Sequence, residues 1–85
     1  MSKESFENNL DHMYDLYQNE YLKSIDLTEI ACIHSNIECF KYFYRNRYPF
    51  NKERCERALY ILYIDPNEFK FKHIHYEFLE YVKNL

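Results

Sequence analysis

Apolar residues return every three or four positions along most of this chain. The first series is Phe6, Leu10, Met13, Leu16 and Tyr17, and acidic residues at positions 4, 7, 11 and 15 lie near the opposite side. Spacings of 3, 4 and 7 place side chains on one face of an α-helix. The pattern therefore predicts an amphipathic helix over about residues 4–19, with a solvated acidic face.

Two more helices are predicted before residue 47. Asp26 followed by Glu29 forms a capping box, in which two side chains satisfy free N–H groups at a helix start. A short second helix should begin there and break at residues 35–36. The third apolar series should end near residues 45–46, because Pro49 disfavours a helix at the preceding residue and cannot donate a backbone hydrogen bond.

Start signals for two last helices follow. Asn51 can cap a fourth helix that reaches about Tyr63. The run Asp65-Pro66-Asn67-Glu68 offers an N-cap acceptor, Pro at N1 and Glu at N3, which predicts a fifth helix. Residues 69–72 alternate Phe and Lys and could instead form a short strand. We expect helix there.

The apolar spacing also repeats along the chain. A segment that starts at Leu10 recurs 27 residues later, and part of it recurs again near the end of the chain after an insertion of about eleven residues around 61–71. Such periods are typical of stacked helical arrays, in which each unit buries its apolar face against the next. The pattern predicts that residues 13–19, 40–46 and 78–84 form equivalent, neighbouring outer helices. The first two copies are Leu10, Met13, Leu16, Tyr17, Asn19, Tyr21 and Ile37, Phe40, Phe43, Tyr44, Asn46, Tyr48.

Composition agrees with an all-α fold. The 85 residues suit a single domain over 1–85. The chain contains no glycine, whereas tight β-hairpin turns need positive φ angles that glycine supplies most easily. The expected architecture is therefore all-α, with about five helices stacked as helical hairpins.

Residues 26–51 resemble one unit of the ankyrin-like repeats found in large amoeba-infecting DNA viruses. The resemblance implies a short, degenerate ankyrin-like repeat array, a protein-interaction role and a viral source. Ser35 and Arg47 stand where that pattern carries glycine, so Asn36 or Asn46 is expected to take the left-handed conformation instead. The matching residues are Ala31, His34, Asn36, Glu38, Cys39, Lys41, Tyr42, Asn46, Tyr48 and Pro49.

Charge is unevenly distributed about a net value of −3. Residues 1–29 are acidic and residues 41–57 are basic. The start lacks an apolar signal core and no apolar run approaches the roughly 20 residues that span a bilayer, so we expect no membrane segment and an intracellular location. The resemblance to viral repeats implies that this location is the cytoplasm or nucleus of a host cell. Three cysteines without a secretion signal are expected to be reduced, buried thiols.

The basic segment also holds the candidate partner-binding residues. Repeat scaffolds bind through inner helices and adjoining loops, and Tyr and Arg are frequent interface hot spots. The simpler interpretation is that the aromatic residues pack the loop while the arginines are solvated. An alternative function is nucleic-acid binding through residues 41–57, although the net negative charge of the whole chain disfavours it. The candidates are Arg47, Tyr48, Phe50, Arg54, Arg57 and Tyr60.

Other chemistry has weaker support in the sequence. The cysteines and histidines lack a Cys-x-x-Cys pair, so no metal or cofactor is expected, and His34 suits a hydrogen-bonding role at a helix end. His73 and His75 are expected on a partly exposed helix face. No glycine-rich phosphate loop is present, and a short helical stack offers shallow concavity, so no catalysis is expected. A homodimer could cover the excess of aromatic residues.

Overall fold

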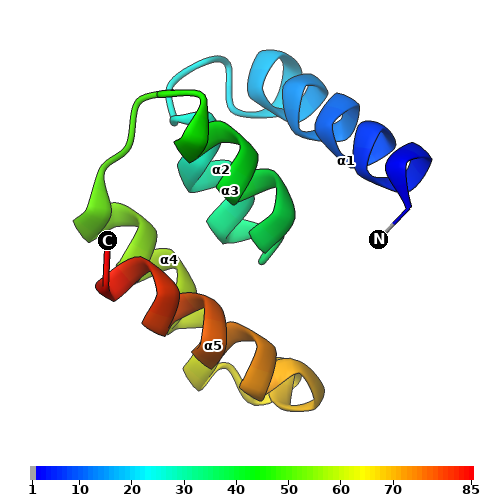
Figure 1. The fold of residues 1–85 in the computed structure, drawn as a ribbon. Coiled ribbons are helices and arrows are strands. Elements are labelled where there is room, and N and C mark those ends of the chain that lie inside the picture. The colour runs from blue at the N-terminus through cyan, green and yellow to red at the C-terminus, as the bar shows by residue number, and fades with distance from the viewer. Residues whose placement is uncertain (1) are drawn as a thin grey trace.

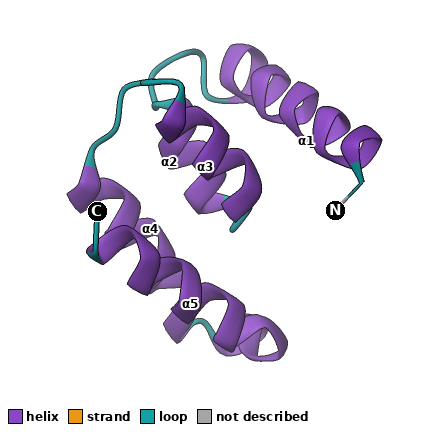
Figure 2. Cartoon of the chain, in the orientation of Figure 1, coloured by secondary structure: helices purple, strands orange, loops and turns teal. Residues whose placement is uncertain are grey.

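The computed structural model describes residues 2–85, and every regular element in that range is helical (Figure 2). The prediction of an all-α fold with five helices is confirmed, and residues 69–75 are helical rather than extended. A π-helical turn, η1, follows the first helix, and a 3₁₀ helix, η2, precedes the last one. The elements are α1 Lys3–Asp15, η1 Leu16–Glu20, α2 Leu27–Ile33, α3 Ile37–Arg45, α4 Lys52–Ile64, η2 Pro66–Phe71 and α5 Lys72–Lys83.

The helices are arranged so that the α2–α3 pair lies between α1 and the α4–α5 hairpin (Figure 1). α4 packs against both α5 and α2, while α1 contacts α3 and α2. The principal dimensions of the described chain are 28 × 27 × 24 Å. The main apolar face of each helix therefore packs against a neighbouring helix, as amphipathic helices require.

Aromatic rings fill the centre of the core. Phe40, Phe43 and Phe78 are fully or almost fully buried. The ring centroids of Phe40 in α3 and Phe78 in α5 lie 5.3 Å apart in an edge-to-face contact, which is a favoured geometry for aromatic pairs. Met13 of α1 is buried as well.

Three cysteines complete the core as free thiols. Cys32, Cys39 and Cys55 have no exposed surface and form no disulfide, as predicted from the sequence. Burial raises the pKa of Cys39 to about 11. Burial first, and then a hydrogen bond with Cys55, raises the pKa of Cys32 well above its ordinary value. These thiols act as small apolar groups.

The helix starts use the predicted caps in part. Asn51 accepts a hydrogen bond from the backbone N–H of Arg54, and Asp65 accepts one from that of Asn67. The predicted capping box at Asp26 is wrong, because Asp26 makes no side-chain cap hydrogen bond. Its intended partner, Glu29, instead pairs with Arg54 of α4.

Positive φ angles occur at the two turns where the repeat pattern carries glycine and this sequence has another residue. Ser35 has φ 51° and Arg47 has φ 62°. The expectation that Asn36 or Asn46 would take this conformation is therefore wrong: their φ angles are −101° and −94°. The residue after each turn donates its N–H to a carbonyl five positions back, Asn36 to Ala31 and Tyr48 to Phe43. This six-to-one bond defines a Schellman cap, which fixes the left-handed position.

The first helical run matches the predicted extent of about 4–19, but its hydrogen bonding changes from α- to π-type near the end. α1 ends at Asp15, and η1 carries the chain to Glu20. The turn that follows holds Leu22 and Lys23 at φ 51° and 60°. Lys23 donates its N–H to the carbonyl of Tyr17, six positions back, so this corner closes with a bond one residue wider than those of the two Schellman caps.

Replacing Arg47 by glycine should stabilise the protein, because a side chain at positive φ costs roughly 1 kcal/mol. The free energy of unfolding from urea titration should rise by about 1 kcal/mol for Arg47→Gly relative to Arg47→Ala. Alanine is the matched control, since it removes the same side chain but keeps Cβ. Equal stability of the two variants would contradict strain at this corner.

Candidate functional site

Two aromatic residues of the predicted binding set, Tyr48 and Phe50, lie in the loop between α3 and α4 and pack against the core. The ring of Tyr48 lies 5.1 Å from that of Phe43, and its hydroxyl is 3.1 Å from the hydroxyl of Tyr14. Burial first, and then this hydrogen bond, raises the pKa of Tyr14. Phe50 makes an edge contact with Phe40, with ring centroids 5.7 Å apart. Tyr48 and Phe50 therefore hold the loop against the core.

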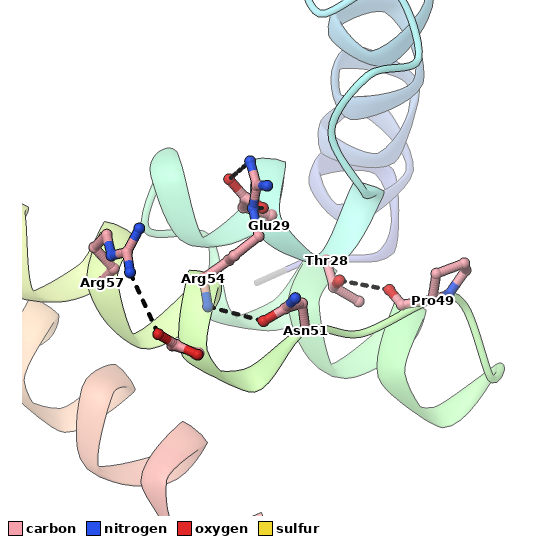
Figure 3. A network of polar contacts seen from close by, with 7 residues as sticks. Thr28, Glu29, Pro49, Asn51, Arg54 and Arg57 are labelled. Atoms are coloured by element: carbon pink, nitrogen blue, oxygen red, sulfur yellow. Dashed lines mark hydrogen bonds and ion pairs between the residues drawn. The ribbon is translucent and has the colours of Figure 1, made fainter.

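The same loop is anchored to α2 by a buried hydrogen bond. Thr28 Oγ1 donates to the carbonyl oxygen of Pro49 at 2.7 Å (Figure 3). Thr28 has no exposed surface. Satisfying a buried hydroxyl in this way avoids a desolvation penalty of about 1–3 kcal/mol. The bond sets the position of the loop relative to α2, and so the distance between α2 and α4.

An ion pair spans the two helices next to the loop. Arg54 Nε donates to Glu29 Oε1 at 2.7 Å, and a second, longer contact joins Nη2 to Oε2 at 3.5 Å (Figure 3). The side chain of Glu29 is 10% exposed and that of Arg54 is 54% exposed. The hydrogen bond that Arg54 donates to Glu29 raises the pKa of Arg54. Arg57 contacts Glu53 one turn away in α4 at 3.4 Å, with both side chains exposed.

A groove opens between α2 and α4 beside these arginines. Its volume is about 410 Å³. Glu29, Arg54 and Arg57 are its charged lining residues, and apolar side chains supply the rest of its lining, including Ile61, which is 57% exposed. The lining residues are Glu29, Ile33, Arg54, Arg57, Ala58, Ile61 and Leu62. The groove can therefore take apolar side chains and pair with a carboxylate at its edge.

The remaining predicted residues lie elsewhere. Arg47 is exposed at the turn after α3. Tyr60 is 53% exposed and borders a different hollow, together with Leu79 of α5. The structure thus brings Arg54 and Arg57 together at the α2–α4 groove, away from Tyr48 and Phe50, and Arg57 also borders the hollow of Tyr60. The apolar lining from Ala58, Ile61 and Leu62 was not identified from the sequence.

A second hollow, about 420 Å³, continues the groove and shares Ile33 and Leu62 with it. A hydrogen-bonded chain lines it: Ser35 Oγ lies 2.7 Å from His75 Nδ1, and His75 Nε2 lies 3.1 Å from Glu68 Oε1. His75 is only 3% exposed, so its predicted exposure is wrong. His73 is exposed, as expected.

The hydrogen-bonded series of Ser35, His75 and Glu68 has the residue types of a nucleophile, a base and an orienting carboxylate. A hydrolytic site also needs N–H groups directed at the developing oxyanion. The N–H of Asn36, next to Ser35, already donates to the carbonyl of Ala31 in the helix cap. The Ser35–His75 and His75–Glu68 contacts join the turn between α2 and α3 to α5 and η2.

Comparisons were made with protein-family models, curated proteins and solved structures, and no match was found in any of them. Within residues 2–85, no three His, Cys, Asp or Glu side chains come together in a way that could hold a metal ion. No helix in this range is long and apolar enough to cross a bilayer. The case for a function therefore depends on the α2–α4 groove and its surroundings.

Removing Arg54 should destabilise the fold because it leaves the largely buried carboxylate of Glu29 without a partner. We expect Arg54→Met to lower the free energy of unfolding by about 1–2 kcal/mol. Arg57→Met is the matched control in the same helix and should cost less than about 0.5 kcal/mol, because its ion pair is exposed. Urea titration measures both, and equal effects would contradict a structural role for the Glu29–Arg54 pair.

Stability should also depend on the protonation of His34. Burial first, and then the nearby His12 ring, lowers the pKa of His34, while Glu20 opposes the shift. The Tyr21 hydroxyl lies 3.4 Å from its Nε2. Because the folded pKa is below the unfolded value of 6.5, the unfolded chain binds the proton more readily, and stability falls as the pH drops through this range.

The measurement is urea titration of the natural protein and of His34→Gln at neutral and mildly acidic pH. The natural protein should lose more stability on acidification than the variant, in which this proton-binding group is absent. An identical loss in both proteins would show that His34 does not contribute.

Proposed function

We propose that this protein is a non-catalytic protein-binding module, and that the α2–α4 groove receives a segment of the partner. The main support for this proposal is the groove itself, which has an apolar lining from Ile33, Ala58 and Ile61 beside two arginines. Grooves between helices bind apolar side chains of peptides and helices. The partner segment would present apolar residues next to Asp or Glu.

A fixed geometry favours this role. The Glu29–Arg54 pair joins α4 to α2, and the Thr28–Pro49 bond joins the loop before α4 to α2, so the two together hold α4 relative to α2 (Figure 3). A preorganised groove binds with a smaller entropic cost than one that must be ordered on binding. The Arg57 side chain, paired only with an exposed glutamate in its own helix, can turn to a carboxylate of the partner.

We further propose that the helices form a short, degenerate ankyrin-like array, in which α2 and α4 are the inner helices. Three observations support this proposal. Met13, Phe40 and Phe78 occupy matching places in the sequence repeat and are all buried. Asn46 and Asn84 both cap a helix and donate from Nδ2 to the carbonyl four residues before. Positive φ occurs where the repeat pattern carries glycine.

The alternative function, nucleic-acid binding through residues 41–57, has less support, because cations of that segment are engaged within the chain. Lys41 lies 5.1 Å above the ring of Tyr81, and Lys52 donates to the carbonyl of Leu85. Arg54 and Arg57 are in ion pairs. Phosphate binding would compete with each of these contacts.

Selection of peptides from a random display library tests the proposed groove. We expect enrichment of sequences with apolar residues beside Asp or Glu. Ile61→Asp should weaken binding of the selected peptides by at least about tenfold, because it puts a negative charge on the apolar lining. Ile64→Asp is the matched control: Ile64 is 56% exposed in the same helix, against 57% for Ile61, but does not line the groove.

Two results would argue against the groove. Selected peptides that bind the Ile61→Asp variant as well as the natural protein would place the binding surface elsewhere. Binding of oligonucleotides that weakens steeply with added salt, without enrichment of any peptide, would favour the nucleic-acid alternative.

A further inference from the structure

A second surface of the α4–α5 hairpin is rich in exposed aromatic side chains. It lies on the side of α4 opposite Ala58 and the α2–α4 groove, as the helical spacing of Glu56, Tyr60 and Tyr63 requires. Tyr60 is 53% exposed and Tyr76 is 47% exposed. Contiguous apolar surface of this kind marks interaction sites on soluble domains. We call it the outer face of the hairpin.

One end of the outer face projects and is basic. Phe69 of η2 is 74% exposed, the highest value among the exposed aromatic residues. It borders a hollow of about 410 Å³ together with Tyr63, Lys72, His73 and Tyr76. Lys72 lies 5.0 Å above the Tyr63 ring. This end is the connection between α4 and α5, which extends beyond the α2–α3 pair in Figure 1.

The other end of the outer face is hollow and carries acidic residues. A depression of about 350 Å³ lies between α4 and α5, lined by Glu53, Glu56, Arg57, Tyr60, Leu79 and Lys83. Glu53 pairs with Arg57, and Lys83 pairs with Glu80. Across residues 2–85, no cation lies within ion-pair distance of Glu56. Its charge is therefore available to a cation from another molecule.

At one end Phe69 projects beside Lys72, and at the other the hollow carries the carboxylate of Glu56, so these groups are complementary. They cannot meet within one molecule, because they lie at opposite ends of the same hairpin. A two-fold axis through the middle of the outer face would bring the projecting basic end of one copy onto the hollow acidic end of the other, twice. Each contact would place Phe69 in the hollow beside Leu79, and Lys72 close to Glu56.

The outer face is of modest size. It is two helices wide and as long as the thirteen-residue α4, roughly 20 Å by 20 Å. This projection is about 400 Å², half of the ~800 Å² per partner of a standard-size interface, so a dimer through this face belongs to the small and weakly associating class.

We propose that a second copy of this chain covers the outer face in a two-fold symmetric dimer. The aromatic residues Tyr60, Tyr63 and Tyr76 form its centre, and the Phe69 and Lys72 contacts form its two edges. Of the residues that line the α2–α4 groove, Arg57 alone also lines the depression at the edge of this dimer. The apolar lining of the groove lies outside the outer face and stays open.

Light scattering coupled to size-exclusion chromatography, over micromolar to millimolar concentrations, tests the dimer. The natural protein should be dimeric, and Phe69→Glu should be monomeric. Leu22→Glu is the matched control, because Leu22 is 75% exposed, close to the 74% of Phe69, but lies in the turn before α2. This control should remain dimeric. Circular dichroism and thermal unfolding check that all three proteins are folded.

A charge reversal tests the arrangement of the two copies. Glu56→Lys should raise the Kd of the dimer by at least about tenfold, because it opposes Lys72 of the second copy. Adding Lys72→Glu in the same chain should restore the affinity. A monomeric natural protein, or a Phe69→Glu variant that still forms dimers, would overturn the proposal. A Glu56→Lys variant with unchanged Kd would overturn the antiparallel arrangement.

Discussion

The ring of Phe40 joins parts of the chain that are far apart in sequence. It has no exposed surface and contacts Phe50 of the loop and Phe78 and Tyr81 of α5. Interiors are packed at crystal-like density, so the positions of these three neighbours depend on the size and orientation of this one ring. The α4–α5 hairpin and the loop before it are thus placed relative to α3 by the same side chain. The groove between α2 and α4 depends on that placement.

Much of the helical organisation was predictable from local signals. Asn51 and Pro66 mark helix starts through their own backbone and side-chain chemistry, and the apolar spacing identified Phe40, Phe43 and Phe78 as buried. The errors concern competition from distant residues. Glu29 was assigned to a cap three residues away, yet it pairs with Arg54, 25 residues later. A sequence pattern contains no information on which of two partners is nearer in space.

The candidate site was only partly predictable for the same reason. The charge of the 41–57 segment drew attention to Arg54 and Arg57, which do border the groove. Its apolar lining was missed because Ile61 has the same hydrophobic character as buried Leu59, and only the packing of α2 shows which of the two stays accessible. The buried His75 was missed because its partners come from separate elements, Ser35 before α3 and Glu68 in η2.

The three buried thiols give the molecule an internal reporter. Cys32, Cys39 and Cys55 come from three different helices and are shielded from solvent together. Only the thiolate reacts readily with alkylating reagents, and burial suppresses both access and ionisation. Modification must therefore wait until helices separate. The rate of alkylation of a chain with no other cysteine follows the opening of the core itself, without any introduced label.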